Sequence, residues 1–177
     1  MSPGRILLGL GAALLLAGCG GRSDRDVAAG AWCPTPLTLQ DAQRLVRFRG
    51  ASVDPREVVF EAAMSPASSS CEISRNQLKV ELKLRITAIA GPALAEPVTA
   101  VPFFVRLLDG SGRVVQGQDF TAEYKLSAAN PRGSSQEEIA LKLPFSQPQD
   151  LAGYRVVVGL RPTPQELQYN RRAAANR

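Results

Sequence analysis

The side chains that most often carry hydrolytic chemistry are scarce in this chain. Its 177 residues include no histidine, which excludes the serine and cysteine hydrolases that use a histidine base. Paired carboxylates, as in glycosidases, occur at Asp24/Asp26 and at Glu137/Glu138. The first pair lies in a stretch that cannot hold it in place, and adjacent residues on a strand point to opposite faces. We therefore expect a protein that is not an enzyme.

Cysteine is the remaining residue type with distinctive reactivity. The three cysteines are Cys19, Cys33 and Cys71, and their spacing contains no Cys-x-x-Cys redox motif. Without histidine, Cys33 and Cys71 cannot complete a usual zinc site. We expect no metal and no bound cofactor.

Cys19 follows a segment with the anatomy of a secretory signal. Arg5 precedes the apolar run Ile6 to Ala17, which as a helix would span roughly 18 Å, too short for a hydrocarbon core of about 30 Å. Leu16-Ala17-Gly18-Cys19 resembles the lipobox of bacterial lipoproteins. The resemblance implies acylation of the Cys19 thiol, removal of residues 1–18 and attachment to a membrane. The alternative is an ordinary signal peptide cut near Ala17 or Gly18.

The residue after Cys19 indicates which bacterial membrane is expected to hold the chain. In enteric lipoproteins an aspartate at this position favours the inner membrane, whereas this chain has Gly20. The resemblance therefore implies the bacterial cell envelope, with the domain anchored to the outer membrane and facing the periplasm.

With Cys19 acylated, Cys33 and Cys71 remain as an even pair in an oxidising compartment. A disulfide between them is the expected state. The 37 intervening residues make the expected stabilisation about 3 to 4 kcal/mol on the chain-entropy model.

The charge is mildly basic. The formal net charge is +5, and +4 once Arg5 is removed with the leader. Arg171 and Arg172, near the C-terminus, are the candidate contacts with anionic envelope surfaces. The basic residues near 44–49 and 79–85 are interpreted as solvated surface. No interleaving of aromatic and basic residues points to nucleic acid.

The clearest structural pattern runs from Gln77 to Ala90. Apolar and charged or polar side chains alternate there for ten residues, which predicts an antiparallel strand with one buried face. Asp109-Gly110-Ser111-Gly112 lacks the repeated acidic ligands of a calcium loop and predicts a hairpin turn. About seven such strands predict an all-β fold, an antiparallel two-sheet sandwich of immunoglobulin-like or related type.

The expected organisation has four parts. Residues 1–18 are the signal peptide, 19–31 the lipidated cysteine and a flexible linker, 32–169 a single sandwich domain, and 170–177 a disordered basic tail. Thr163, Pro164 and Glu166 have the spacing of a helix start and predict one short helical turn through Tyr169. Pro66 to Ser70 are interpreted as a flexible connection.

Two functions fit these expectations. The first is a lipid-anchored envelope protein that acts as a binding or accessory module for an envelope protein partner. The alternative is a carrier of small ligands or lipids with a pocket between the sheets. Cys33, Cys71 and the ending Gly159 to Leu167 resemble a group of uncharacterised Gram-negative lipoproteins. This resemblance implies the same anchoring and no particular activity.

Overall fold

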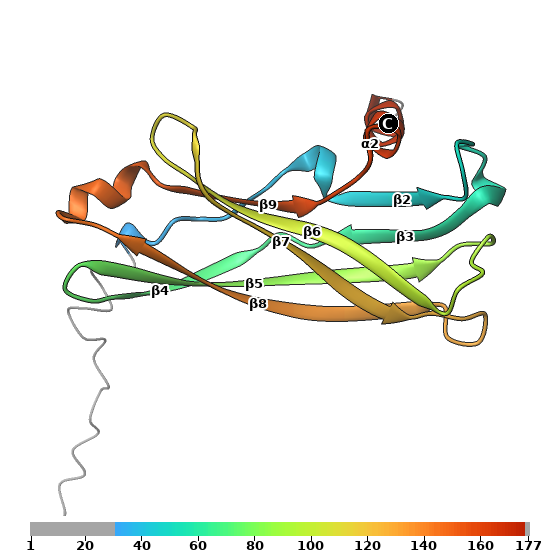
Figure 1. Ribbon diagram of the computed structural model, residues 1–177, viewed down its shortest axis with the longest axis horizontal. Helices are drawn as coiled ribbons and strands as arrows, with labels where there is room; N and C mark the ends of the chain where they lie inside the picture. The colour runs from blue at the N-terminus through green and yellow to red at the C-terminus, as the bar shows by residue number, and fades with distance from the viewer. Residues whose placement is uncertain (1–30, 176–177) are drawn as a thin grey trace, which may run out of the picture.

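A computed structural model describes residues 31–175 of the chain. Two β-sheets pack face to face in a sandwich, and a helix lies over one edge (Figure 1). The strands are β1 (Leu37–Thr38), β2 (Arg44–Phe48), β3 (Val58–Met64), β4 (Ser68–Ile73), β5 (Gln77–Ala90), β6 (Val98–Leu108), β7 (Val114–Lys125), β8 (Arg132–Pro144) and β9 (Arg155–Leu160). The helices are the 3₁₀ turns η1 (Gln40–Ala42), η2 (Pro55–Glu57) and η3 (Pro148–Gly153) and the α-helix α2 (Pro164–Ala175).

Sheet A has the order β1-β9-β6-β7, with a parallel β1–β9 pair and antiparallel pairs elsewhere. Sheet B is antiparallel. Its long strand β5 pairs with β8 along one side and with β3 and β4, one after the other, along the opposite side, while β2 extends the sheet beyond β3. The predicted all-β two-sheet sandwich is confirmed.

The alternation from Gln77 to Ala90 is confirmed as β5. Its apolar side chains point between the sheets, and Leu78, Leu82 and Ile86 are fully buried. They belong to one cluster of buried apolar side chains to which both sheets contribute. Tyr124 of sheet A crosses this layer and donates a hydrogen bond to the carbonyl oxygen of Ile86 in sheet B, 3.2 Å away. Burial therefore raises the pKa of the Tyr124 hydroxyl.

Nine strands form where about seven were expected. The two additional strands are β1 and β4. The interpretation of Pro66 to Ser70 as a flexible connection is wrong for Ser68 to Ser70, because these three residues pair with β5 opposite Lys83 to Glu81. Serine has little strand preference of its own, so the long neighbouring strand organises this segment.

The C-terminal helix is longer than predicted. α2 continues from Pro164 to Ala175, so the predicted disordered tail from Asn170 is wrong for residues 170–175. The physical reason is tertiary contact. The Asn170 side chain donates hydrogen bonds to the backbone carbonyls of Asp41 and Arg44, and Tyr169 packs edge-on against Phe48 with ring centroids 5.1 Å apart.

Candidate functional site

The candidate site is a groove of about 590 Å³ on the outer face of sheet A, called here the α2 groove. It lies between η1, the first turns of α2 and the strands β6 and β9. Apolar side chains form much of its surface: Leu39, Phe104, Pro162 and Leu167. Polar groups of Gln40, Asp41, Arg161 and Arg171 line the remainder. An open apolar surface bordered by polar groups is typical of a binding site.

The start of α2 forms one wall of the groove and is held by a capping box. The Thr163 backbone N–H donates to the Glu166 carboxylate at 2.7 Å, and the Glu166 N–H donates to the Thr163 hydroxyl at 3.3 Å. This confirms the predicted helix start. Glu166 is 3 % exposed and also accepts a hydrogen bond from the Arg47 guanidinium of β2 at 2.5 Å. One carboxylate therefore both caps α2 and joins it to sheet B.

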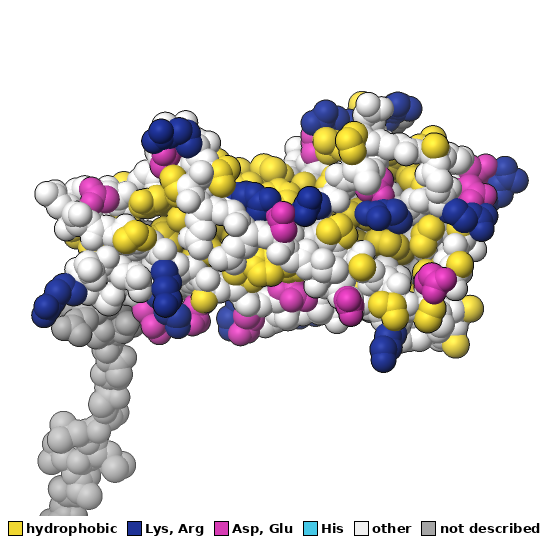
Figure 2. Space-filling model, viewed as in Figure 1, with side chains coloured by type: hydrophobic (Ala, Val, Ile, Leu, Met, Phe, Trp, Pro, Cys, Tyr) yellow, Lys and Arg dark blue, Asp and Glu magenta, His cyan; other side chains and the backbone are white. Residues whose placement is uncertain are grey.

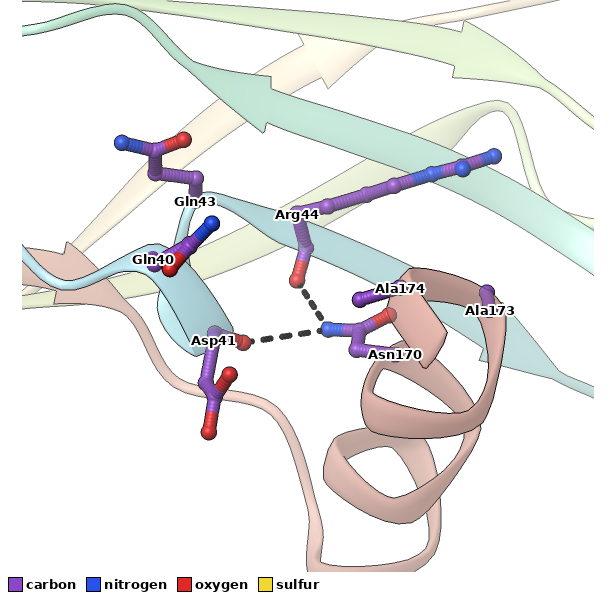
Figure 3. A pocket seen from close by; sticks show the side chains of 7 residues that line it. All are labelled: Gln40, Asp41, Gln43, Arg44, Asn170, Ala173 and Ala174. Atoms are coloured by element: carbon purple, nitrogen blue, oxygen red, sulfur yellow. Dashed lines mark hydrogen bonds between the residues drawn. The ribbon is translucent and has the colours of Figure 1, made fainter. Parts of the chain in front are cut away.

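Further along, α2 is fixed to η1. The Asn170 amide lies between the carbonyl oxygens of Asp41 and Arg44, at 3.2 and 2.6 Å (Figure 3). The next residue, Arg171, forms an ion pair with the Asp41 carboxylate at 2.9 Å. A smaller cavity of about 190 Å³ adjoins this contact, lined by η1, the start of β2 and the last turns of α2. The groove wall is thus held by several polar contacts in addition to packing.

The floor of the groove depends on a close approach at Gly159. A Cβ atom at this position would lie 2.7 Å from the Ala42 Cβ and 3.0 Å from the Phe104 ring. Since real Cβ contacts are longer than this, glycine is required for η1 and Phe104 to meet over β9. The absence of a side chain at residue 159 therefore allows Ala42 and Phe104, which both line the groove, to approach β9 closely.

Charge in the groove is distributed unevenly. The Asp119 carboxylate of β7 forms ion pairs with two guanidinium groups, that of Arg106 at 2.6 Å and that of Arg161 at 3.0 Å. The hydrogen bond from Arg106 and the nearby positive charges hold the pKa of the Asp119 carboxyl below its ordinary value. One acid therefore faces two cations, while Arg171 is balanced by Asp41. The Arg161 side of the groove carries a surplus positive charge.

The outer face of sheet A is apolar over a considerable part of its area. Figure 2 shows hydrophobic side chains over β6, β7 and β9, with a few basic and acidic groups among them. The Arg106 guanidinium lies over the Phe104 ring, 5.1 Å from its centroid. Phe104 is thus an outward-facing aromatic side chain with a cation on one side and an open groove on the other.

Cys33 and Cys71 form the predicted disulfide, with Cα atoms 5.6 Å apart. It joins the segment before β1 to β4 at the edge of the sandwich. Trp32, beside the bridge, packs partly buried against the core. Cys19, the predicted lipidation site, lies outside the described residues, as do Asp24 and Asp26.

The two predicted surface arginines have different surroundings. Arg171 lines the α2 groove and is paired with Asp41. Arg172 contacts the Gln168 side chain one turn earlier in the helix, at 3.4 Å. The structure does not bring the two guanidinium groups together at one site.

The other charged candidates have local partners. Arg44, Arg47 and Arg49 form ion pairs with Glu61, Glu166 and Glu57. In the acidic pair, Glu138 is exposed and contacts Lys83 at 3.3 Å, whereas Glu137 is half-buried on the opposite side of β8. Asp109 accepts hydrogen bonds from the turn that it begins, which confirms the predicted hairpin.

The α2 groove was not predicted from the sequence. One signal was present: Phe103, Val105 and Leu107 occupy the buried side of β6, so Phe104 belongs to the side where a polar residue is expected. The remaining lining residues come from η1, β9, α2 and the loop residues beside them, and no spacing in the sequence connects them.

Within residues 31–175 no group of three or more cysteine or acidic side chains is placed to hold a metal ion. None of the helices described is both long enough and apolar enough to cross a membrane. Comparisons with protein-family models, with curated proteins and with solved structures return no match.

Proposed function

We propose that this chain is a lipid-anchored protein of the bacterial cell envelope whose sandwich acts as a binding and accessory module. The α2 groove is its contact surface for an envelope protein partner. The observation that carries the binding role is the groove itself, because Leu39 and Phe104 present apolar surface to solvent beside Arg161.

The anchoring part of the proposal rests on Leu16-Ala17-Gly18-Cys19 and on the apolar run before it. The Cys33–Cys71 disulfide agrees with an extracytoplasmic location, since such bridges persist in oxidising compartments. Residues 20–31, as a flexible coil, would span about 20 Å and lift the domain clear of the lipid headgroups. The Gly20 position favours the outer membrane, with the domain facing the periplasm.

The form of the groove suits a protein segment. It is open to solvent, so an extended or helical segment can place apolar side chains on Phe104 and Leu167. An acidic residue in the same segment would meet the surplus charge at Arg161. Tethering both partners to one envelope would raise their effective concentration and allow a weak contact to be functional.

A photoreactive amino acid at Leu39, which is 40 % exposed, tests this proposal in intact cells. The matched control is the same amino acid at Ser70, an exposed residue on sheet B. We expect one reproducible adduct with an envelope protein from position 39 and none from position 70. Adducts of equal yield from both positions, or none from either, would count against the groove as the contact surface.

A carrier of small apolar ligands is the second candidate, and one observation favours it. The groove volume lies in the range of about 300 to 1,000 Å³ that small-molecule sites occupy. The groove lies on the outer face of sheet A, whereas the carrier hypothesis placed its pocket between the sheets. Mass spectrometry of the purified protein under native conditions separates the candidates. A stoichiometric small ligand that Phe104→Ala releases would favour the carrier.

A further inference from the structure

The edge of sheet B formed by β8 is a second surface with a defined chemistry. Among the described residues β8 pairs with β5 alone, over thirteen residue pairs without a register shift. In Figure 1 its first half runs along the lower border of the sandwich, and its second half rises past β5 toward the left. At the opposite border of sheet B, by contrast, β2 packs against α2. Unpaired strand edges present free backbone donors and acceptors to other chains.

Hydrogen bonds at both ends of β8 identify its free backbone groups. The Ala90 N–H donates to the Pro131 carbonyl, and the Phe145 N–H donates to the Asn76 carbonyl. Residues 131 and 145 therefore direct their backbone toward β5, and in an antiparallel pair every second residue between them does the same. The even-numbered residues, Ala140 among them, direct N–H and C=O groups away from β5.

The second half of β8 is more accessible to another chain than its beginning. At its beginning the Ser135 hydroxyl is hydrogen-bonded to Tyr124 of β7, and Gly133 lies directly under the Tyr124 ring. From Gln136 to Pro144 the even-numbered side chains are all exposed. An additional strand has most room along this second half.

The charges on the open half are unbalanced on their own sheet. Lys142 lies opposite Lys79 of β5, a like-charge neighbour that is unfavourable at this distance. Lys79 is itself paired with Glu81, and among the described residues Lys142 forms no ion pair. Glu138, four residues earlier on the same face, contacts Lys83 at 3.3 Å, but its side chain stays 63 % exposed and can accept a second cation.

We propose that a second copy of this chain pairs with β8 edge to edge, antiparallel, about a two-fold axis at Ala140. In this register Glu138 of each copy lies opposite Lys142 of the other, which gives Lys142 the anion that its own sheet lacks. On the inner side, Ile139 of one copy meets Leu141 of the other. The two five-stranded sheets then form one continuous sheet.

Neighbouring registers are less favourable. An axis at Ile139 or Leu141 leaves Glu138 and Lys142 opposite uncharged residues. An axis at Glu138 opposes two carboxylates, and an axis at Lys142 opposes two ammonium groups, either of which destabilises the pair. Ala140 places the smallest side chain of this row on the axis. The charge pattern therefore selects one register among those that keep the even-numbered backbone groups facing each other.

Cysteine crosslinking of the full chain in cell membranes tests the register. In the proposed dimer the two residues at position 140 have Cα atoms about 5.5 Å apart, within disulfide reach. Ser134 lies on the same face of the same strand, but the two copies of residue 134 would be about 40 Å apart. After mild oxidation, Ala140→Cys should give a disulfide-linked dimer in at least about tenfold higher yield than Ser134→Cys.

Two further variants separate register from chance collision. In the Ala140→Cys background, Glu138→Lys should lower the dimer yield severalfold, and adding Lys142→Glu should restore it. Equal dimer yields from Ala140→Cys and Ser134→Cys would overturn the proposal. So would a dimer yield from Ala140→Cys that neither Glu138→Lys nor Lys142→Glu changes.

Discussion

Glu166 is the residue on which the position of α2 depends most. It is buried, it accepts the N-cap hydrogen bond from Thr163, and it pairs with Arg47, whose guanidinium also lies 5.7 Å from the centroid of the Phe60 ring. A buried carboxylate is costly unless it is paired and hydrogen-bonded. Its two partners come from the loop before α2 and from β2, so one side chain couples three segments.

Glu166→Ala is expected to lower the free energy of unfolding by about 3 kcal/mol, because the cap is lost and Arg47 loses its anion. Glu166→Gln retains an oxygen for the cap and should cost about half as much. Glu96→Gln, at an exposed carboxylate, should change little. Urea denaturation of the three variants measures the differences. Equal losses for Glu166→Ala and Glu96→Gln would contradict this role.

Asp109 gives a prediction about pH. Hydrogen bonds, first from the Ser111 hydroxyl and then from the Arg113 backbone, lower the pKa of the Asp109 carboxyl to about 2. A lowered pKa in the folded state contributes stability that is present above the ordinary value near 3.8 and is lost as the pH falls toward 2. Asp109→Asn should therefore reduce the loss of stability between pH 4 and pH 2. Chemical denaturation at several pH values checks this, and identical slopes in both proteins would refute it.

At the scale of elements, the Cys33–Cys71 disulfide connects two segments, the one before β1 and strand β4, that share few other contacts. The segment before β1 contacts β4 through a few hydrogen bonds, such as Ser69 to the Pro34 carbonyl at 2.8 Å. The double variant Cys33→Ser/Cys71→Ser should lose about 3 to 4 kcal/mol of unfolding free energy. Wild-type protein treated with reductant should show the same loss. A change below about 1 kcal/mol would mean that the bridge adds little to packing.

Gly159 allows a test of how the groove is built. Gly159→Ala should destabilise the protein by about 1 to 3 kcal/mol through overpacking against Ala42 and Phe104. It should also weaken crosslinking from Leu39, because η1 must move. Gly110→Ala is the control, since its added Cβ would have only an ordinary contact of 3.6 Å with Gly153. Thermal unfolding of both variants distinguishes the two positions.

Elements with a strong local pattern could be predicted from the sequence. The alternation in β5, the Asp109 turn and the start of α2 at Thr163 all depend on contacts within a few residues. The strand at Ser68 and the continuation of α2 past Asn170 could not be predicted, because pairing with β5 and contacts with Asp41 stabilise them. The α2 groove also could not be predicted, because its lining residues come from elements that are far apart in the sequence.

At the scale of the whole molecule, the proposed function joins two regions of the chain. The described domain presents the α2 groove on one sheet and the free β8 edge on the other. A tether at Cys19 would hold both surfaces close to one membrane, where weak contacts gain from a high local concentration. Without the tether the same surfaces would have to bind from free solution.

The most direct test of this account is lipidation of Cys19 in cells. Metabolic labelling with an alkyne fatty acid, followed by membrane fractionation, should find labelled wild-type protein in the membrane. Cys19→Ala should carry no label and should accumulate as uncut precursor or as soluble protein, whereas Cys33→Ser/Cys71→Ser should still be labelled. An unlabelled wild-type chain, or a Cys19→Ala chain that matures and fractionates like wild type, would contradict the account.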